Sequence, residues 1–221
     1  MKKILAVILA VVCIFAMFSC GEDEVFSNMD TKFASSVPTR IVTTTTQVIG
    51  NTTLNGNYEL KTGSVDGKVA TVAVYSYDEL NKIEEGSGED ITTAVKTVSG
   101  SKEFYAGKGV RIDGGSWADG YNFAPIAGSI SLEINEKNVL EYTYENNTFT
   151  CKVSKEKAAE VLKIDVTPSS DVSVVITDNG AEITSVTIEY TIVDADENYP
   201  DTVVKIETQY YYGLQEVTFV K

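Results

Sequence analysis

The hydrophobic pattern of the chain changes its period near residue 40. Beyond that point apolar and polar residues alternate with a period of two in many short runs. This alternation is typical of antiparallel strands with one buried face and one wet face. In the run 182–193, for example, Val186, Ile188 and Tyr190 fall on one face and Thr187 falls on the other. We expect about nine or ten strands among the runs at 41–47, 58–62, 69–77, 91–98, 102–105, 140–145, 148–153, 171–177, 182–193, 203–210 and 217–219.

Turn-forming residues separate these runs in a way that favours consecutive hairpins. Asp66-Gly67, Asn146-Asn147 and Asp178-Asn179-Gly180 each lie between two alternating runs, and such pairs are strong hairpin signals. Ser99-Gly100-Ser101 predicts a further turn. The acidic, glycine-bearing stretch 77–90 predicts a loop with a short helical turn at about 78–83.

Two stretches show the helical period instead. The first, at 26–37, carries an apolar stripe with spacings of three and four, made of Phe26, Met29, Phe33 and Val37. Ser27 with Asp30 predicts a capping box at its start, and Pro38 predicts its end. The second runs from Ser154 to about Lys163 and has a narrow stripe of Ala158, Val161 and Leu162.

These elements predict an α+β fold that is mainly antiparallel β. We expect a curved meander sheet, a half-barrel, covered by the N-terminal amphipathic helix and by the short helix of the C-terminal half. The concave face would collect aromatic side chains that include Tyr142, Tyr190 and Tyr210. If the helices cover this face completely, it forms an ordinary core; if they do not, it forms an apolar cavity of the kind that binds lipids or small molecules.

The stretch 107–125 is rich in glycine and carries Trp117, Tyr121 and Phe123. These aromatic residues either insert into the core of the domain or form a flap over a ligand cavity. Both interpretations stay open at this point, and the three residues are candidate lid residues.

The first residues predict an export signal. Lys2 and Lys3 precede an apolar run at 4–18, which is the shape of a secretory signal and is too short for a comfortable membrane span. The ending Met17-Phe18-Ser19-Cys20-Gly21 resembles the lipobox of bacterial lipoproteins, which implies cleavage before Cys20 and acyl chains on its thiol. We therefore expect a signal peptide at 1–19, a lipidated Cys20 with a tether at 20–25, and one domain at 26–221. The alternatives are a plain signal peptide with another cut site and an uncleaved anchor.

A resemblance extends over about residues 25–221. A short tether, an amphipathic helix ending at Pro38-Thr39-Arg40-Ile41-Val42-Thr43, an antiparallel meander and a helix after 148–153 resemble a family of small uncharacterised bacterial lipoproteins. More remotely, the order of elements is similar to the LolA/LolB and LppX/LprG carriers, in which a helix-plugged half-barrel holds acyl chains. The resemblance implies a carrier fold and assigns no functional residue.

Composition excludes several kinds of chemistry. The formal net charge of −14 argues against nucleic-acid binding, which depends on basic contacts. The chain has no histidine, which removes His-based catalysis and His-ligated zinc. Cys151 alternates with apolar neighbours and is expected to be a small core residue. We expect no cofactor and no enzymatic activity.

The acidic segment near residue 195 needs separate treatment. Asp194 and Asp196 mimic the start of a calcium loop, but Tyr199 stands where glycine is required and Lys205 where a bidentate Glu is required. The segment is therefore no EF-hand. Weak calcium binding by Asp194, Asp196, Glu197 and Asp201 and a solvated loop both stay open.

The leading hypothesis is an extracytoplasmic lipoprotein that is anchored to the membrane by acyl chains on Cys20 and binds a lipid or another apolar ligand. The alternative is a non-catalytic interaction or structural module with a filled core. An enzyme ranks last of the three.

Overall fold

The computed structural model describes residues 24–65, 68–85, 92–105, 108–118, 132–193 and 200–217. Several of the positions singled out above lie outside these residues. They are the signal segment, Cys20, Tyr121, Phe123 and most of the acidic segment, namely Asp194, Asp196 and Glu197.

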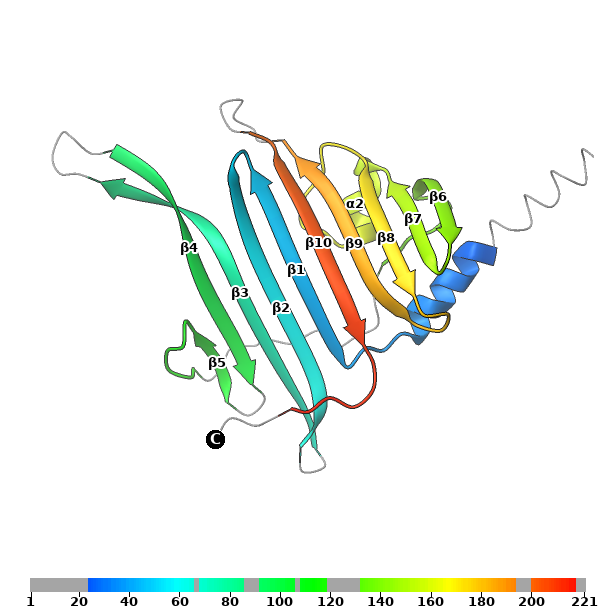
Figure 1. Cartoon of the computed structure of the whole chain (residues 1–221), viewed down its shortest axis with the longest axis horizontal. Helices are drawn as coiled ribbons and strands as arrows, with labels where there is room; N and C mark the ends of the chain where they lie inside the picture. The colour runs from blue at the N-terminus through cyan, green and yellow to red at the C-terminus, as the bar shows by residue number, and fades with distance from the viewer. Residues whose placement is uncertain are drawn as a thin grey trace, which may run out of the picture.

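Ten strands form one open, curved antiparallel sheet (Figure 1). They are β1 (Arg40–Ile49), β2 (Thr52–Val65), β3 (Lys68–Glu85), β4 (Thr92–Tyr105), β5 (Gly109–Ile112), β6 (Val139–Glu145), β7 (Thr148–Val153), β8 (Val172–Asp178), β9 (Ile183–Ile192) and β10 (Thr202–Tyr211). The prediction of a mainly antiparallel β fold is confirmed. The sheet does not close on itself, and β5 and β6 lie at its two ends.

Two sequential meanders meet in the middle of this sheet. The spatial order is β5-β4-β3-β2-β1-β10-β9-β8-β7-β6, so the first strand pairs with the last. The pairing runs over the full length of β1, from Arg40 opposite Tyr211 to Ile49 opposite Thr202. The two halves of the sheet are therefore joined by strands that lie far apart in sequence.

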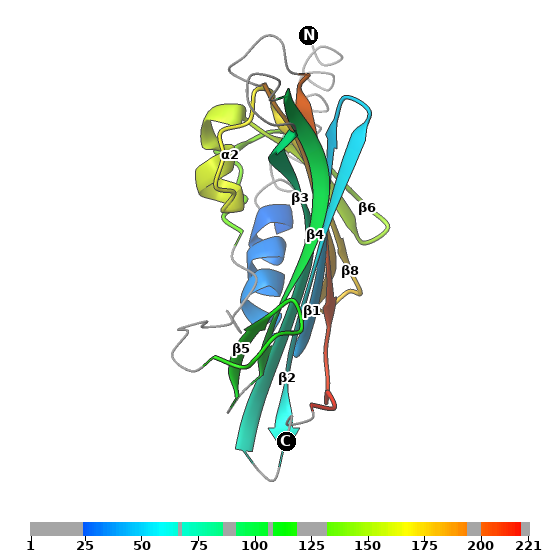
Figure 2. The same cartoon turned by 90° about the vertical axis from the view of Figure 1, so that its left-hand side faces the viewer.

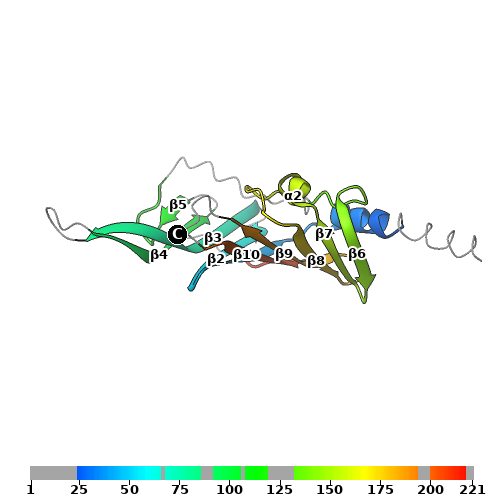
Figure 3. The ribbon, with the colours of Figure 1, turned by 90° about the horizontal axis from the view of Figure 1, so that it is seen from above.

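Two helices lie on the same side of the sheet (Figure 2). Seen from above, both lie at the β6–β10 end of the long axis, with β3 and β4 reaching toward the other end (Figure 3). The N-terminal helix spans residues 24–35, and α2 spans Lys155–Leu162, with Ala158, Val161 and Leu162 buried as predicted. Within the described residues, neither helix is long and apolar enough to cross a membrane.

The start and the end of the N-terminal helix differ from the prediction. Phe26, Met29 and Phe33 are buried as expected, but Val37 lies beyond the helix and is 64% exposed. Ser36 is buried in its place, and its hydroxyl accepts a hydrogen bond from the backbone N–H of Ile183. Because the helix begins before Ser27, the expected capping box is wrong: the Ser27 carbonyl instead accepts a bond from Thr31 within the helix.

The hydrophobic core joins the helices to the β6–β10 half only. Its buried members come from the N-terminal helix, α2, β7–β10 and the segment near Ile134. No described residue between β1 and β5 belongs to this cluster. Among the side chains of that half that the structure describes, a few scattered ones are buried, namely Leu54, Leu60, Ala70, Ala73 and Val110. The molecule is therefore asymmetric, with one thick half and one thin half.

Three predicted hairpins are confirmed, and the backbone conformations of the described turn residues suit the residue types found there. Asn146 and Asn147 both have positive φ, 50° and 60°, as a two-residue type I′ turn requires between β6 and β7. Gly180 has a φ of 96° in the β8–β9 turn. Val65 pairs with Lys68, so β2 and β3 form the hairpin expected from Asp66-Gly67.

Two predictions between residues 77 and 105 are wrong. The expected loop after Tyr77 is the continuation of β3, which pairs with β4 as far as Glu85 opposite Thr92. The expected turn at Ser99-Gly100-Ser101 is the interior of β4, where Gly100 lies opposite Tyr77. A Cβ atom at Gly100 would lie 2.8 Å from the Tyr77 ring. The glycine therefore makes room for an aromatic ring and does not reverse the chain.

The face of the sheet turned away from the helices is polar. Glu59 accepts a 2.6 Å bond from Arg40, and Lys61 lies 3.2 Å from the same carboxylate. Residues directly opposite each other on paired strands share a face, so these side chains lie together on the wet side. Such partly exposed pairs add little to stability, but they keep this face soluble.

Candidate functional site

A buried polar cluster joins the N-terminal helix to the sheet. The Lys32 ammonium lies 2.8 Å from a carboxylate oxygen of Asp178, and the two side chains are only 7% and 1% exposed. Lys32 also donates to the Tyr144 hydroxyl at 3.1 Å, and that hydroxyl donates to Asp178 at 3.0 Å. The second oxygen of Asp178 accepts from the N–H of Gly180 at 2.7 Å. Every charge in the cluster is thus paired and hydrogen-bonded, as burial demands.

Both ions of this cluster are stabilised in their charged forms. Burial opposes the charge of Asp178, but hydrogen bonds from Lys32, Gly180 and Tyr144 outweigh it and hold its pKa below the ordinary value. Burial also opposes the charge of Lys32, yet the bonds to Asp178 and Tyr144 raise its pKa. This geometry indicates a structural role, in which the cluster holds the N-terminal helix to the sheet, because neither group is left unpaired to act on a substrate.

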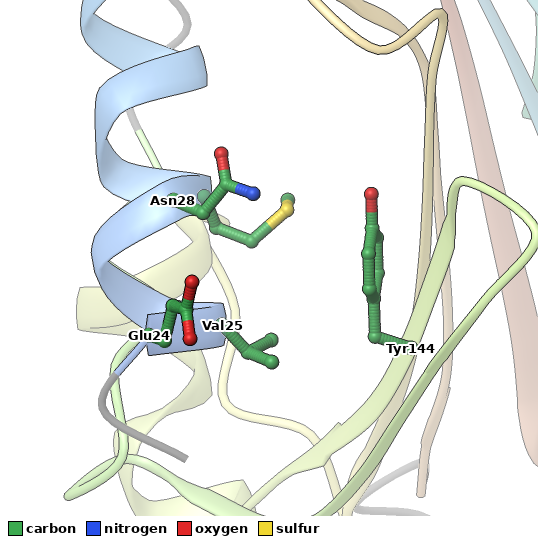
Figure 4. Close-up of a pocket in the computed structure, with 5 residues that line it drawn as sticks. Glu24, Val25, Asn28 and Tyr144 are labelled. Atoms are coloured by element: carbon green, nitrogen blue, oxygen red, sulfur yellow. The ribbon is translucent and has the colours of Figure 1, made fainter. Parts of the chain in front are cut away.

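A pocket of about 210 Å³ lies next to this cluster, between the first turns of the N-terminal helix and the β6–β7 hairpin (Figure 4). We call it the helix–hairpin pocket; its lining is Glu24, Val25, Asn28, Met29 and Tyr144. In Figure 4, Val25 and the ring of Tyr144 face one another across the gap. Glu24 and Asn28 are exposed, whereas Met29 is buried. The pocket therefore has an apolar interior and a polar rim, which is the usual lining of a small-molecule site.

Three aromatic residues predicted at a cavity belong to the core cluster. Tyr190 is buried, and Tyr142 and Tyr210 pack against the same cluster. The Tyr142 ring lies edge-on to Phe26, with 4.9 Å between ring centroids, and is stacked on Phe149 at 5.7 Å. Burial raises the pKa of Tyr210. Within the described part of the chain, Phe26 of the N-terminal helix thus packs directly on Tyr142.

Trp117 lies at the opposite end of the sheet, beyond β5. Its ring is edge-on to Tyr105 at 5.4 Å, and the Arg111 guanidinium lies 4.9 Å from its centroid. Arg111 pairs across the strands with Glu103, to which it is salt-bridged at 2.7 Å. The strand register places Glu103 on the face of the sheet that is turned away from the helices, opposite to the face that carries Tyr210. The described structure does not bring Trp117 together with Tyr142, Tyr190 or Tyr210.

Reactive groups are scarce in the part of the chain that the structure describes. Cys151 is 2% exposed, as expected for a core residue, and burial raises the pKa of its thiol to about 12. A thiol in that state is a poor nucleophile. Among the residues that the structure describes, no cluster of acidic or thiol side chains could hold a metal ion.

Sequence reasoning missed the Lys32–Tyr144–Asp178 cluster. One signal was available, because Lys32 falls on the apolar side of its helix, between Met29, Phe33 and Ser36. An uncompensated lysine there would be costly, so a buried partner could have been expected. Asp178 gave no such signal, since an acid before Asn-Gly reads as an ordinary turn residue.

Comparisons with known proteins add little. Neither the models of known protein families nor the curated protein sequences match the chain. One similar solved structure is that of a DUF1329 family protein from Desulfovibrio piger. The alignment covers 89% of this chain and 94% of that chain, with 12% sequence identity and a TM-score of 0.25. With so low a TM-score, the likeness carries no conclusion on fold or function.

Proposed function

We propose that the chain is a non-catalytic lipoprotein of the bacterial cell envelope, held outside the cytoplasm by acyl chains on Cys20. We further propose that it binds an apolar ligand, an acyl chain in the first place, in the helix–hairpin pocket. The observation that carries this proposal is the position of the pocket at the very start of the domain, next to the predicted membrane anchor.

The distance along the chain supports this position. Glu24, at the pocket rim, follows Cys20 by only four residues. An extended chain spans at most about 3.6 Å per residue, so the rim lies within roughly 14 Å of an anchored Cys20. A ligand leaving the outer layer of the bilayer would have a short path into the pocket.

The lining supports an apolar occupant. The wall contributed by Tyr144 needs no polar partner from a ligand, because its hydroxyl already bonds to Lys32 and Asp178. Met29 is unbranched and adapts easily to the shape of a guest. The volume of about 210 Å³ lies below the range of roughly 300–1,000 Å³ that is usual for drug-sized ligands. The pocket therefore suits the end of an acyl chain and not a whole lipid.

Titration calorimetry of decanoate binding to residues 21–221 tests the site. Val25→Phe narrows the pocket, and each displaced methylene is worth about 0.8 kcal/mol, so the loss of two methylenes weakens binding roughly tenfold. Val25→Ile is the matched control and should bind nearly as the parent does. Equal affinities for Val25→Phe and the parent would remove the pocket from the proposal.

The anchor is tested separately. In cells, Cys20→Ala should abolish metabolic palmitate labelling and release the protein from the membrane fraction. Labelling that persists in this variant would contradict lipidation at Cys20, whatever the pocket binds.

The second candidate is an interaction module with a filled core, and one observation favours it. Phe26 of the helix and Tyr142 and Phe149 of the sheet are in mutual ring contact, and they occupy the space that a larger ligand would need. Native mass spectrometry of residues 21–221 from several expression hosts discriminates between the two. A bound lipid mass that disappears on delipidation supports the ligand-binding protein, and a clean apo mass in each host supports the module.

A further inference from the structure

The sheet divides at Asp78, in the thin half of the molecule. Pairing between β2 and β3 stops at Gly56 opposite Tyr77, whereas β3 continues with β4 to Glu85 opposite Thr92. Figure 1 shows β3 and β4 turning away from β2 at this level. Asp78 holds the fork together, because it accepts a 3.0 Å bond from the backbone N–H of Asn55 and a 2.6 Å bond from the Ser99 hydroxyl.

A hollow of about 80 Å³ opens beside this fork. We call it the fork hollow; it is lined by Thr45, Gln47, Leu54, Asn55, Gly56, Tyr75, Tyr77 and Asp78. Gly56 contributes no side chain to it. A Cβ atom there would meet Thr45 at 3.7 Å and Tyr75 at 3.9 Å, which are ordinary contacts. Neither crowding nor a positive φ requires glycine at this position. The missing side chain of Gly56 simply leaves the hollow open.

An aromatic surface forms one side of the hollow. The Tyr75 and Tyr77 rings are stacked, with 5.1 Å between centroids and 19° between planes. Tyr75 lies in the middle of β3 and is 38% exposed, so its ring is accessible to solvent. The Lys102 ammonium lies 5.5 Å from the Tyr77 centroid.

Polar groups of every hydrogen-bonding type surround these rings. The Asp78 carboxylate only accepts, the Lys102 ammonium only donates, and the Thr45 hydroxyl and Gln47 amide do both. The described part of the chain supplies no side-chain hydrogen bond to Thr45 or Gln47. Both side chains line the hollow.

We propose that the fork hollow binds one ring of a neutral saccharide. The C–H face of a sugar ring stacks on Tyr75, and its neighbouring hydroxyl groups, which both donate and accept, bond to Gln47, Thr45 and Asp78. An acyl chain would leave these polar groups without partners. A quaternary ammonium ion would be repelled by Lys102, and the near-parallel rings do not enclose it as an aromatic cage does. This inference concerns a different part of the sheet from the helix–hairpin pocket and goes beyond the proposed function.

Saturation-transfer NMR on the full-length chain in detergent micelles tests the proposal, with maltotriose, cellotriose and chitotriose as probes. We expect at least one of them to receive saturation on its ring protons at millimolar concentration, because the hollow is shallow. Gly56→Val fills the hollow with a residue that favours strands. The loss of one stacking contact should weaken binding about tenfold.

Two further variants keep the test independent of folding. Tyr75→Phe keeps the ring and should retain binding, whereas Tyr75→Ser should lose it. Decanoate binding at the helix–hairpin pocket should stay unchanged in all three variants, which separates failure here from failure of the proposed function. The proposal is overturned if none of the probes receives saturation, if Gly56→Val binds as the parent does, or if tetramethylammonium binds in their place.

Discussion

At the scale of single residues, the ion pair between Lys32 and Asp178 has the largest predicted effect. Replacing Lys32 by Met leaves the Asp178 carboxylate buried without its main partner. Breaking a buried pair from one side typically costs 3–5 kcal/mol, so Lys32→Met should lower the free energy of unfolding by about 4 kcal/mol. Urea unfolding followed by circular dichroism measures this change. The double variant Lys32→Met/Asp178→Leu should recover much of the loss, and a double variant less stable than the single one would contradict the argument.

The same pair predicts a pH dependence. The pKa of Asp178 is lowered from 3.8, so its contribution is complete above that value and is lost as pH falls below it through the lowered pKa of the folded state. The pKa of Lys32 is raised from 10.5, so its contribution is complete below that value and is lost as pH rises further. The stability difference between the parent and the double variant should be constant from about pH 5 to 10 and fall on both sides. A difference that does not change below pH 4 would exclude Asp178 as its source.

Gly100 gives a third prediction at this scale. Gly100→Ala pushes a Cβ atom to within 2.8 Å of Tyr77, and such overpacking costs about 1–3 kcal/mol. In a Tyr77→Ala background the same substitution should cost little. Thermal unfolding of the four variants in a double-mutant cycle measures the coupling. Equal costs in both backgrounds would mean that the glycine is there for another reason.

At the scale of elements, the N-terminal helix behaves as part of the core. Phe33 is 5% exposed within the main cluster, and removing a buried phenylalanine side chain costs about 3–5 kcal/mol. Phe33→Ala should therefore destabilise the whole fold by that amount, measured by urea unfolding. Asp30→Ala, on the exposed side of the same helix, is the control and should change stability by less than about 0.5 kcal/mol. A separate, weaker transition for the helix would contradict this view.

The accuracy of the sequence-based predictions followed how local the deciding interaction was. Strands β6 to β10 were predicted well because Asn146-Asn147 and Asp178-Asn179-Gly180 determine their turns locally, and their buried faces force alternation. The extension of β3 beyond Tyr77 was missed because it pairs with β4 alone. A two-stranded ribbon needs no row of buried residues, so its sequence resembles a loop.

The candidate sites were harder to predict for the same reason. Lys32 and Asp178 lie far apart in the chain, and their contact depends on the helix crossing the β8–β9 turn. The fork hollow depends on the place where β2 and β3 separate, which no local pattern marks. Tyr142, Tyr190 and Tyr210 were correctly assigned to the helix-facing side, but their role in the core became visible only with the helix in place.

At the scale of the whole molecule, the two halves of the chain differ in whether they contain enough of the hydrophobic core to fold alone. The main cluster takes residues from the N-terminal helix and from the segment after residue 132. The fragment 21–118 should therefore be unfolded in isolation, because its helix has no partner and its five strands lack the main cluster. Amide dispersion in a proton–nitrogen NMR spectrum tests this. A cooperative thermal transition in the fragment would contradict it.

The contact between the first helix and the last strands has a consequence for biosynthesis. A ribosome releases Phe26, Met29 and Phe33 long before it makes the strands that bury them. Until the strands after residue 138 have formed, this apolar stripe lacks its native partners, which for Phe26 include Tyr142 and Phe149, and it is open to chaperones and proteases. In an interrupted or truncated chain the stripe stays exposed to solvent, whereas in the complete folded chain it is buried. Exposure of this stripe therefore marks a chain whose C-terminal half has not yet folded.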